Sequence, residues 1–173
     1  MTASVFVGAT VDGFIARANG AIDFLPPNGG EPHGYAEFMD TVDAIVIGRK
    51  TFETVLSFPE WPYDKPAVVL TSNPQRLTAP AGADCEIINA TPLEVVARLT
   101  QRGKAHIYVD GGVTVQRFLA AGLIQRIIVT RVPILIGEGT PLFGRLAHDI
   151  RLEHVETRTY RSGLVRTEYR VDS

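Results

Sequence analysis

Three segments of the sequence place glycine, hydroxyl or cationic residues directly after a short apolar run. These segments are AIVIG-RKTFE, AVVLT-SNPQR and IYVD-GGVTVQRFL. Each pattern predicts a buried strand that ends in a turn, from which a helix begins. In open α/β sheets, ligands bind outside the carboxyl ends of the strands, where helix N-termini offer free N–H groups to phosphate. The chemistry that these residues predict is therefore the binding of a phosphate-bearing ligand.

The first of these turns holds two adjacent cations, Arg49 and Lys50, in the expected first turn of a helix. A cation there opposes the helix dipole by roughly 0.3–1 kcal/mol, so the pair is unfavourable unless an anion offsets it. The alternative is that G-R-K is a solvated turn and that Gly111 and Gly112 form only a bend, because short motifs have low specificity. The G-x-G-x-x-G and Walker patterns are both absent from the sequence. Three such turns in one chain favour the ligand.

The remaining pattern supplies the elements that would position these residues. Short runs rich in valine and isoleucine predict strands at residues 4–10, 44–48, 67–72, 85–89, 106–110 and 126–135. Amphipathic stretches predict helices at residues 34–42, 93–100 and 113–122. The tail alternates with period two around Ser162 and Gly163, which is typical of a β-hairpin. The fold class we expect is α/β, with a mixed, mostly parallel sheet flanked by helices and a C-terminal antiparallel hairpin.

Length and composition restrict the classes of protein that the sequence can form. A chain of 173 residues with 45% hydrophobic content fits one domain, residues 1–173, with a sizeable core. The net charge of −2 provides no basic stripe for nucleic acid, and the apolar runs are too short to span a membrane. Cys85 is the single cysteine, so we expect no internal disulfide and no metal site. The N-terminus does not resemble a signal peptide, so we expect a cytoplasmic protein.

Four segments together resemble the dihydrofolate reductase superfamily, in particular the branch that includes the reductase domain of bacterial riboflavin biosynthesis. The segments are FVGATVDGFIARANGAIDFL, DAIVIGRKTFE, KPAVVLTSNP and IYVDGGVTVQRFLAAGLIQRIIVTRVPILIGEGTPLF. They occur in the family's order and spacing, and the resemblance extends from Val5 to about Tyr169. It implies one dihydrofolate-reductase-like domain that binds NADPH across the carboxyl ends of its strands.

The resemblance also implies which residues would contact NADPH. Arg49 would bind the 2′-phosphate, because a planar cation with a nearby hydroxyl, here that of Ser72, suits this group. The glycine pair would approach the pyrophosphate, and Ile15 and Ala16 would border the nicotinamide ring. The full set of expected cofactor residues is Gly8, Ala9, Ile15, Ala16, Gly48, Arg49, Lys50, Thr51, Leu70, Thr71, Ser72, Asp110, Gly111, Gly112, Val113 and Thr114.

The residue that supplies a proton is harder to place, because the chain departs from the dihydrofolate reductase pattern. Asp23 falls about where that family has a tryptophan, and Pro32, with Glu31 beside it, falls near the family's carboxylate. Asp23 and Glu31 are therefore the candidate acids, and Thr130 aligns with a polar residue beneath the active site. The alternative is that both carboxylates are solvated loop residues. Asp110 is unfavourable beside a pyrophosphate unless it points away and caps the following helix.

These observations predict an NADPH-dependent oxidoreductase that transfers a hydride to a small heterocyclic substrate, pteridine-like or pyrimidine-like. The alternative is a non-catalytic nucleotide-binding or interaction protein on the same fold. We expect a small molecule as partner, without nucleic acid or membrane, and a homodimer is compatible with exposed strand edges. The glycines of GEG, residues 137–139, form either a tight turn or a backbone edge that approaches the ligand.

Overall fold

The computed structural model describes residues 1–26 and 30–172. Its strands are β1 (Thr2–Thr10), β2 (Phe14–Ala16), β3 (Ala44–Gly48), β4 (Ala67–Leu70), β5 (Cys85–Ile88), β6 (His106–Asp110), β7 (Arg126–Val132), β8 (Thr140–Pro141), β9 (Leu152–Thr159) and β10 (Val165–Val171). Its helices are α1 (Tyr35–Asp40), α2 (Arg49–Leu56), α3 (Pro92–Gln101) and α4 (Gly112–Ala120). No helix within the described ranges is long and apolar enough to cross a membrane.

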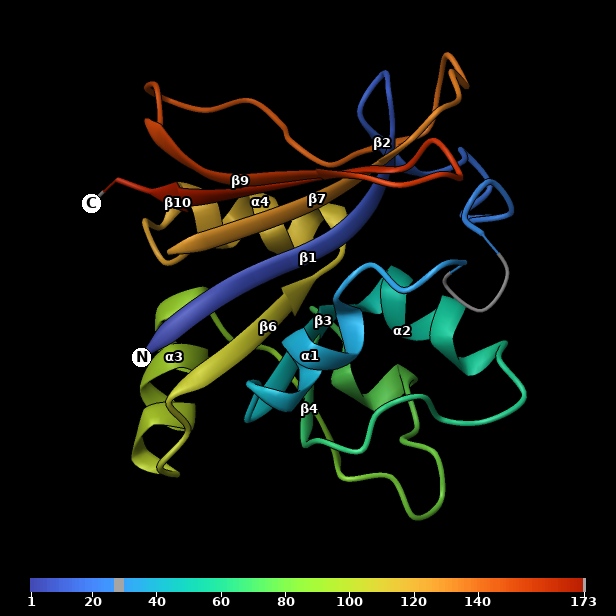
Figure 1. Ribbon diagram of the computed structural model, residues 1–173. Coiled ribbons are helices and arrows are strands. Elements are labelled where there is room, and N and C mark those ends of the chain that lie inside the picture. Colours follow the sequence, from blue (N-terminus) through green and yellow to red (C-terminus); the bar gives the residue numbers. More distant parts are fainter. Residues whose placement is uncertain (27–29, 173) are drawn as a thin grey trace.

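Eight strands form one sheet in the order β5-β4-β3-β6-β1-β7-β10-β9. Neighbouring strands from β5 to β7 run parallel, whereas β10 runs antiparallel to both β7 and β9. The small strands β2 and β8 pair separately. Because parallel strands end at the same edge, the turns after β3, β4 and β6 come together there (Figure 1). The predicted α/β class, the mostly parallel sheet and the C-terminal antiparallel hairpin are thus confirmed.

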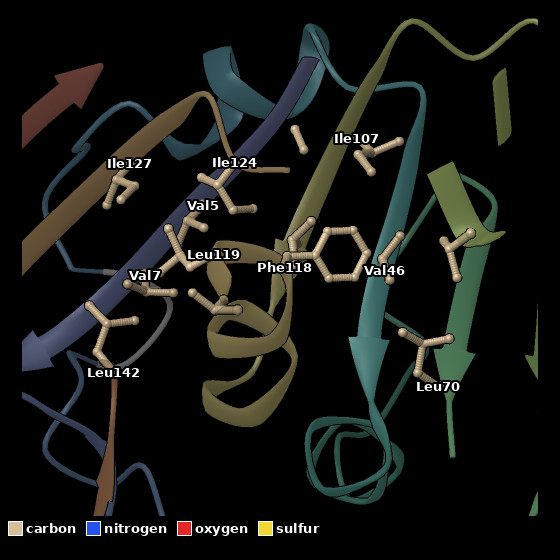
Figure 2. Packing of buried hydrophobic residues seen from close by; sticks show 14 of the residues in the cluster. Val5, Val7, Val46, Leu70, Ile107, Phe118, Leu119, Ile124, Ile127 and Leu142 are labelled. Carbon is tan, nitrogen blue, oxygen red and sulfur yellow. The ribbon is translucent and has the colours of Figure 1, made fainter. Parts of the chain in front are cut away.

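The two faces of the sheet carry separate hydrophobic cores, because side chains alternate along each strand. On β1, Val5 and Val7 pack with residues of α3 and α4, whereas Phe6 packs with residues of α1 and α2. Figure 1 shows α1 in front of the sheet and α4 behind it. In Figure 2, Phe118 of α4 points toward Val46 of β3, and both residues are completely buried. Packing on both faces therefore fixes the positions of the strand ends.

Two local predictions from the sequence are wrong. The strand expected at residues 126–135 ends at Val132, because Pro133 has no backbone N–H with which to continue the strand. The helix expected after AVVLT is only a three-residue 3₁₀ turn, Pro74–Arg76. Pro80 biases the residue before it toward extended backbone, which opposes a longer helix here. The turns after β3 and β6 do open into helices, as predicted.

Candidate functional site

A cavity of about 1070 Å³ opens at the carboxyl ends of β1, β3, β4 and β6. Among the expected cofactor residues, Ala9 is the exception that does not line it; its side chain is buried in the core shared with α3 and α4. The expected residues that do line the cavity are Gly8, Ile15, Ala16, Gly48, Arg49, Lys50, Thr51, Leu70, Thr71, Ser72, Asp110, Gly111, Gly112, Val113 and Thr114. The fold thus brings together segments that lie far apart in the sequence.

The turns after β3 and β6 interlock through glycines and threonines. A Cβ atom added to Gly48 would lie 2.5 Å from Oγ1 of Thr114 in α4. In the other direction, a Cβ atom on Gly111 would overlap Oγ1 of Thr51 in α2. Gly111 also has a φ of 95°, a conformation that favours glycine. Each glycine thus admits a threonine from the other turn, so the N-termini of α2 and α4 lie side by side at the cavity.

These two helices begin without a side-chain cap from any described residue. Their N-cap residues are Gly48 and Gly111. All residues of both helices are described, and the first turns contain no acidic residue. By contrast, α3 has a complete capping box formed by Thr91 and Glu94, and its first turn does not line the cavity as described. The first N–H groups of α2 and α4 are therefore available to another partner, and the helix dipoles favour an anion.

The cations at the start of α2 form part of the cavity wall. Arg49 donates a hydrogen bond to Glu53 at 2.7 Å, and half of the Arg49 side chain is exposed. An exposed pair of this spacing contributes only about 0.3–0.5 kcal/mol, so a phosphate can compete for Arg49. Ser72, after β4, also lines the cavity, and its hydroxyl accepts a hydrogen bond from the Asn73 side chain at 3.3 Å.

A second part of the cavity has aromatic walls. Phe6, Tyr35, Tyr63 and Tyr108 all line it. The rings of Phe6 and Tyr35 meet edge to face, with 5.4 Å between centroids. Burial raises the pKa of Tyr35 to about 12 and also raises the pKa values of Tyr63 and Tyr108, so the three phenols stay protonated at neutral pH. Flat apolar walls with hydroxyl groups at their edges suit a planar ring.

Asp110 lies at the carboxyl end of β6 and lines this cavity. Its Oδ1 accepts a hydrogen bond from the backbone N–H of Gly111 at 2.7 Å. Burial raises the pKa of the Asp110 carboxyl to about 6, although the Gly111 N–H and the Tyr108 hydroxyl act in the opposite direction. The side chain shares a sheet face with Tyr108, two residues earlier, because side chains alternate along the strand. Asp110 therefore belongs to the aromatic part of the cavity.

Thr130, on β7, supplies a second polar group to the cavity. The residue is 4% exposed, and its Oγ1 has no hydrogen-bond partner among the described residues. In the sheet Thr130 is paired with Gly8 of β1. A buried hydroxyl that lacks a partner is costly, which indicates that a bound molecule or water completes its hydrogen bonding.

The two loop carboxylates proposed as acids have other partners. Asp23 accepts hydrogen bonds from Arg17 at 2.6 and 3.0 Å, and this cation lowers the pKa of the Asp23 carboxyl. Glu31 accepts a hydrogen bond from the backbone N–H of Ser162 at 3.0 Å, and the Ser162 hydroxyl together with this N–H lowers the pKa of Glu31. Neither side chain lines the cavity formed by the described residues. The geometry therefore gives no support to a proton-donor role for Asp23 or Glu31.

The GEG loop forms a turn that is held by Asp12. The Asp12 carboxylate accepts hydrogen bonds from the N–H groups of Ile136 and Gly137, at 3.2 and 2.8 Å, and from the Thr10 hydroxyl at 2.6 Å. Gly139 packs against the backbone of Ala16 in β2. GEG thus forms a tight turn that packs on β2, and its three residues do not line the described cavity.

Comparison with known protein families identifies the family of this chain. The family model of the RibD C-terminal domain matches residues 2–166. The chain belongs to the RibD C-terminal domain family. It is 32% identical over 160 residues to the uncharacterized protein YwjB of Bacillus subtilis strain 168, and the match covers 90% of each chain. It is 28% identical to YyaP of the same organism, which covers 94% of this chain and 91% of YyaP.

Several solved structures are also similar to this RibD C-terminal domain. A Shewanella sp. PV-4 protein named for riboflavin biosynthesis is 34% identical, with a TM-score of 0.90 and complete coverage of both chains. Dihydrofolate reductase from Enterococcus faecalis, complexed with NADP(H) and RAB-propyl, is 18% identical, with a TM-score of 0.72 and coverage of 99% and 97%. RibD from Acinetobacter baumannii is 16% identical with a TM-score of 0.71, and the similarity covers 58% of that chain. The dihydrofolate-reductase-like fold is therefore confirmed.

In the aromatic part of the site of this RibD C-terminal domain, sequence reasoning missed Phe6, Tyr63 and Tyr108. Tyr63 follows α2 in a loop rich in proline and carries no local signal. Phe6 and Tyr108 were visible in the sequence only as apolar strand residues. Their positions do contain a usable signal, because Tyr108 and Asp110 are two residues apart and must point to the same face of the sheet.

Proposed function

We propose that this RibD C-terminal domain is an NADPH-dependent reductase that transfers a hydride to a small planar heterocycle of the pyrimidine or pteridine kind. The observation that carries the proposal is the adjacency of two helix N-termini, interlocked by Gly48 and Gly111 and facing one cavity. Two such N-termini suit the two phosphates of a dinucleotide. The printed names of similar structures, dihydrofolate reductase with NADP(H) and a pyrimidine reductase-like protein of Corynebacterium diphtheriae, support the proposal.

The residues at the cavity wall fit NADPH in separate groups. The backbone N–H groups and threonine hydroxyls of α2 and α4 would bind the pyrophosphate, and Arg49 with Ser72 would bind the 2′-phosphate. Ile15 and Ala16 of β2 would border the nicotinamide ring. When bound, the cofactor supplies a hydride. The chain orients the substrate between its aromatic walls and excludes water from it.

Cofactor binding is the first test of this proposal. Trp61, the single tryptophan, packs edge to face on Phe52 of α2 at 6.0 Å and on the cavity residue Tyr63 at 5.2 Å. Its fluorescence should therefore decrease when NADPH binds. We expect NADPH to bind in the micromolar range and more tightly than NADH. If neither nucleotide binds below the millimolar range, the proposed function is wrong.

The 2′-phosphate assignment has its own test in Arg49→Ala. Loss of a charge-assisted contact is expected to weaken NADPH binding by about tenfold or more, with little change for NADH. Arg102→Ala is a suitable control, because Arg102 is an exposed arginine after α3 that pairs with Glu86 and does not line the described cavity. Equal losses for both nucleotides in Arg49→Ala would contradict the assignment.

The second candidate function is a non-catalytic nucleotide-binding protein on the same fold. The observation that favours it is that Asp23 and Glu31 are both engaged elsewhere. Oxidation of NADPH, followed by its absorbance in the presence of dihydrofolate and of pyrimidine substrates, separates the two. Tight NADPH binding without oxidation against any of these compounds would support the non-catalytic alternative.

A further inference from the structure

The cations that line the cavity come from two helices. Within the described lining, the lysines and arginines are Arg49 and Lys50 of α2 and Arg117 of α4. Arg49 and Lys50 lie in the first turn of α2, and α4 packs on the opposite face of the sheet. Residues 27–29 and 173, which are not described, include no lysine or arginine. The cations therefore belong to the helices whose N-termini would hold the cofactor phosphates.

Another part of the cavity has an apolar wall, formed by two loops. Its residues are Ile22 and Leu25 from the loop after β2, and Phe58, Pro59 and Pro62 from the loop after α2. A helix of eight residues is about 12 Å long, so Phe58 follows α2 about one helix length from Arg49. A Cβ atom added to Gly8 would lie 2.7 Å from Cδ2 of Leu25, which places Leu25 directly over β1.

Aromatic packing holds the apolar wall in place. Trp61 lies between Pro59 and Pro62 and packs edge to face on the fully buried Phe52, with 6.0 Å between ring centroids. The two prolines restrict the backbone of this loop further, because their rings fix φ. Phe58 is nevertheless 39% exposed. A large apolar side chain that is held in contact with water at a cavity favours an apolar partner.

The charges that act near the apolar wall are negative. Burial raises the pKa of Tyr35 to about 12, and the carboxylates of Asp110 and Asp64 contribute to this rise. Asp64 comes from the same loop as Phe58. A phosphate or carboxylate group placed here would meet like charges instead of a cation, and burial of an unpaired anion is costly.

Two basic side chains in the segment before α1 have partners of their own. Arg17 donates a hydrogen bond to Asp23 at 2.6 Å and does not line the described cavity. His33 lines the cavity, but its ring packs on Phe6 with 5.7 Å between centroids. Its Nδ1 lies 3.2 Å from the carbonyl oxygen of Glu31. Neither side chain supplies a cation to the apolar wall.

We infer that the substrate carries an uncharged, apolar substituent that packs on the apolar wall, and that a phosphate or carboxylate at this place is rejected. This inference rests on the proposed function and narrows its substrate class. An anion would lose its hydration on entry without gaining a cation, whereas contact with Phe58 and Leu25 favours an apolar group. Selectivity of this kind depends on the penalty for the wrong ligand as well as on the contacts of the right one.

Three probes with the same ring test this inference. They are 6-(benzylamino)uracil and the same compound with either a carboxylate or a phosphonate at the para position of the benzyl group. Calorimetry with NADP⁺ present measures their binding. We expect the uncharged probe to bind at least about tenfold more tightly than either anionic probe.

Phe58→Arg adds a cation to the apolar wall at an exposed position. The preference for the uncharged probe should fall at least about fivefold, because the guanidinium can bind the anionic group. Leu135→Arg is the matched control, since Leu135 is 71% exposed and does not line the described cavity. It should leave the three affinities unchanged. Pro62→Arg, at a second exposed position of the wall, repeats the test.

The affinity for NADPH shows separately whether each variant is folded, and it should change less than about threefold. The inference is overturned if the unmodified protein binds the phosphonate as tightly as the uncharged probe, or binds NADPH but none of the probes. It is also overturned if Phe58→Arg and Pro62→Arg bind NADPH normally and keep the original preference. Failure of the unmodified protein to bind NADPH would overturn the proposed function itself, and the inference with it.

Discussion

The surroundings of a carboxyl group decide its protonation, and two aspartates of this chain illustrate opposite outcomes. Asp23 faces the guanidinium of Arg17, which lowers the pKa of the Asp23 carboxyl. Asp110 is enclosed by aromatic rings, and burial raises its pKa to about 6. Residue type alone does not distinguish the two carboxyl groups, because both are aspartates near the expected site. The partner within reach assigns the first to the surface and the second to the site.

The raised pKa of Asp110 predicts a pH-dependent gain in stability for Asp110→Asn. Its pKa is about 6 in the folded protein and 3.8 as the ordinary value, so the folded state binds more protons between these values. Stability therefore falls as pH rises through this window and stays reduced above it. Because one pKa unit corresponds to about 1.4 kcal/mol and water in the cavity weakens the effect, we expect a cost of about 1–2 kcal/mol at neutral pH.

Urea unfolding at about pH 4 and about pH 7.5 measures this difference. The advantage of Asp110→Asn over the unmodified protein should grow between the two pH values. Asp23→Asn should show the opposite trend, because the pKa of Asp23 is lowered and its ion pair stabilises the fold only while the carboxyl is ionised. If the stability gained in Asp110→Asn does not depend on pH, burial does not raise the pKa of the Asp110 carboxyl.

At the scale of the element, the three longer helices divide into two kinds. The helix α3 satisfies its own first N–H groups with Thr91 and Glu94. The helices α2 and α4 begin at glycine, which offers no side-chain cap, and α2 also has cations in its first turn. Their N-termini therefore lack the stabilisation that the capping box gives to α3. This arrangement is reasonable if an anion completes the N-termini of α2 and α4.

An aspartate introduced at the second position of a helix tests this division. Val113 in α4 and Leu93 in α3 are both second residues of their helices and are 62% and 63% exposed. Val113→Asp should stabilise the protein by about 0.3–1 kcal/mol, because the carboxylate favours the positive end of the dipole. It should also weaken NADPH binding by about tenfold or more, because it would repel the pyrophosphate.

Leu93→Asp is the matched control, and it should leave NADPH binding unchanged. Thermal unfolding measures stability, and quenching of Trp61 measures binding. If Val113→Asp binds NADPH as well as Leu93→Asp does, the N-terminus of α4 does not hold the cofactor phosphates.

At the scale of the whole molecule, the C-terminal strands leave one edge of the sheet open. The strand β9 ends the order of the sheet and is exposed along most of its length. Leu152 and Val155 on this strand are 42% and 52% exposed, and Phe143 and Leu146 in the preceding loop are also exposed. An exposed edge strand with apolar side chains is a site where another chain can pair.

We propose that a second copy of the chain covers β9, and that residues 1–173 form one domain in each copy. Sedimentation should give about twice the mass of one chain, 18.8 kDa. Val155→Lys should shift the protein toward the monomer, because it places a charge in an apolar contact. Leu135→Lys is the control, since Leu135 is 71% exposed in the loop after β7. A monomer at micromolar concentration for the unmodified protein would contradict the proposal.

Much of the fold follows from local pattern in the sequence. Runs of valine and isoleucine mark the buried strands, and glycine marks where β3 and β6 turn into α2 and α4. These features depend on neighbouring residues, because alternation, helical period and backbone freedom act over a few positions. The failures are also local in origin: Pro133 ends β7 early, and Pro80 opposes a helix after β4.

By itself, the sequence therefore determined the α/β class, the strand ends that form the cavity and the residues expected at the cofactor. Only the tertiary structure decided which acid lines the cavity. Asp110 and Thr130 are twenty positions apart in the chain, yet they flank β1, because the sheet places β6 and β7 on either side of the first strand. Asp23 is near the site in sequence, but Arg17 holds it at the surface. Strand order and long-range packing set these distances, and no local pattern encodes them.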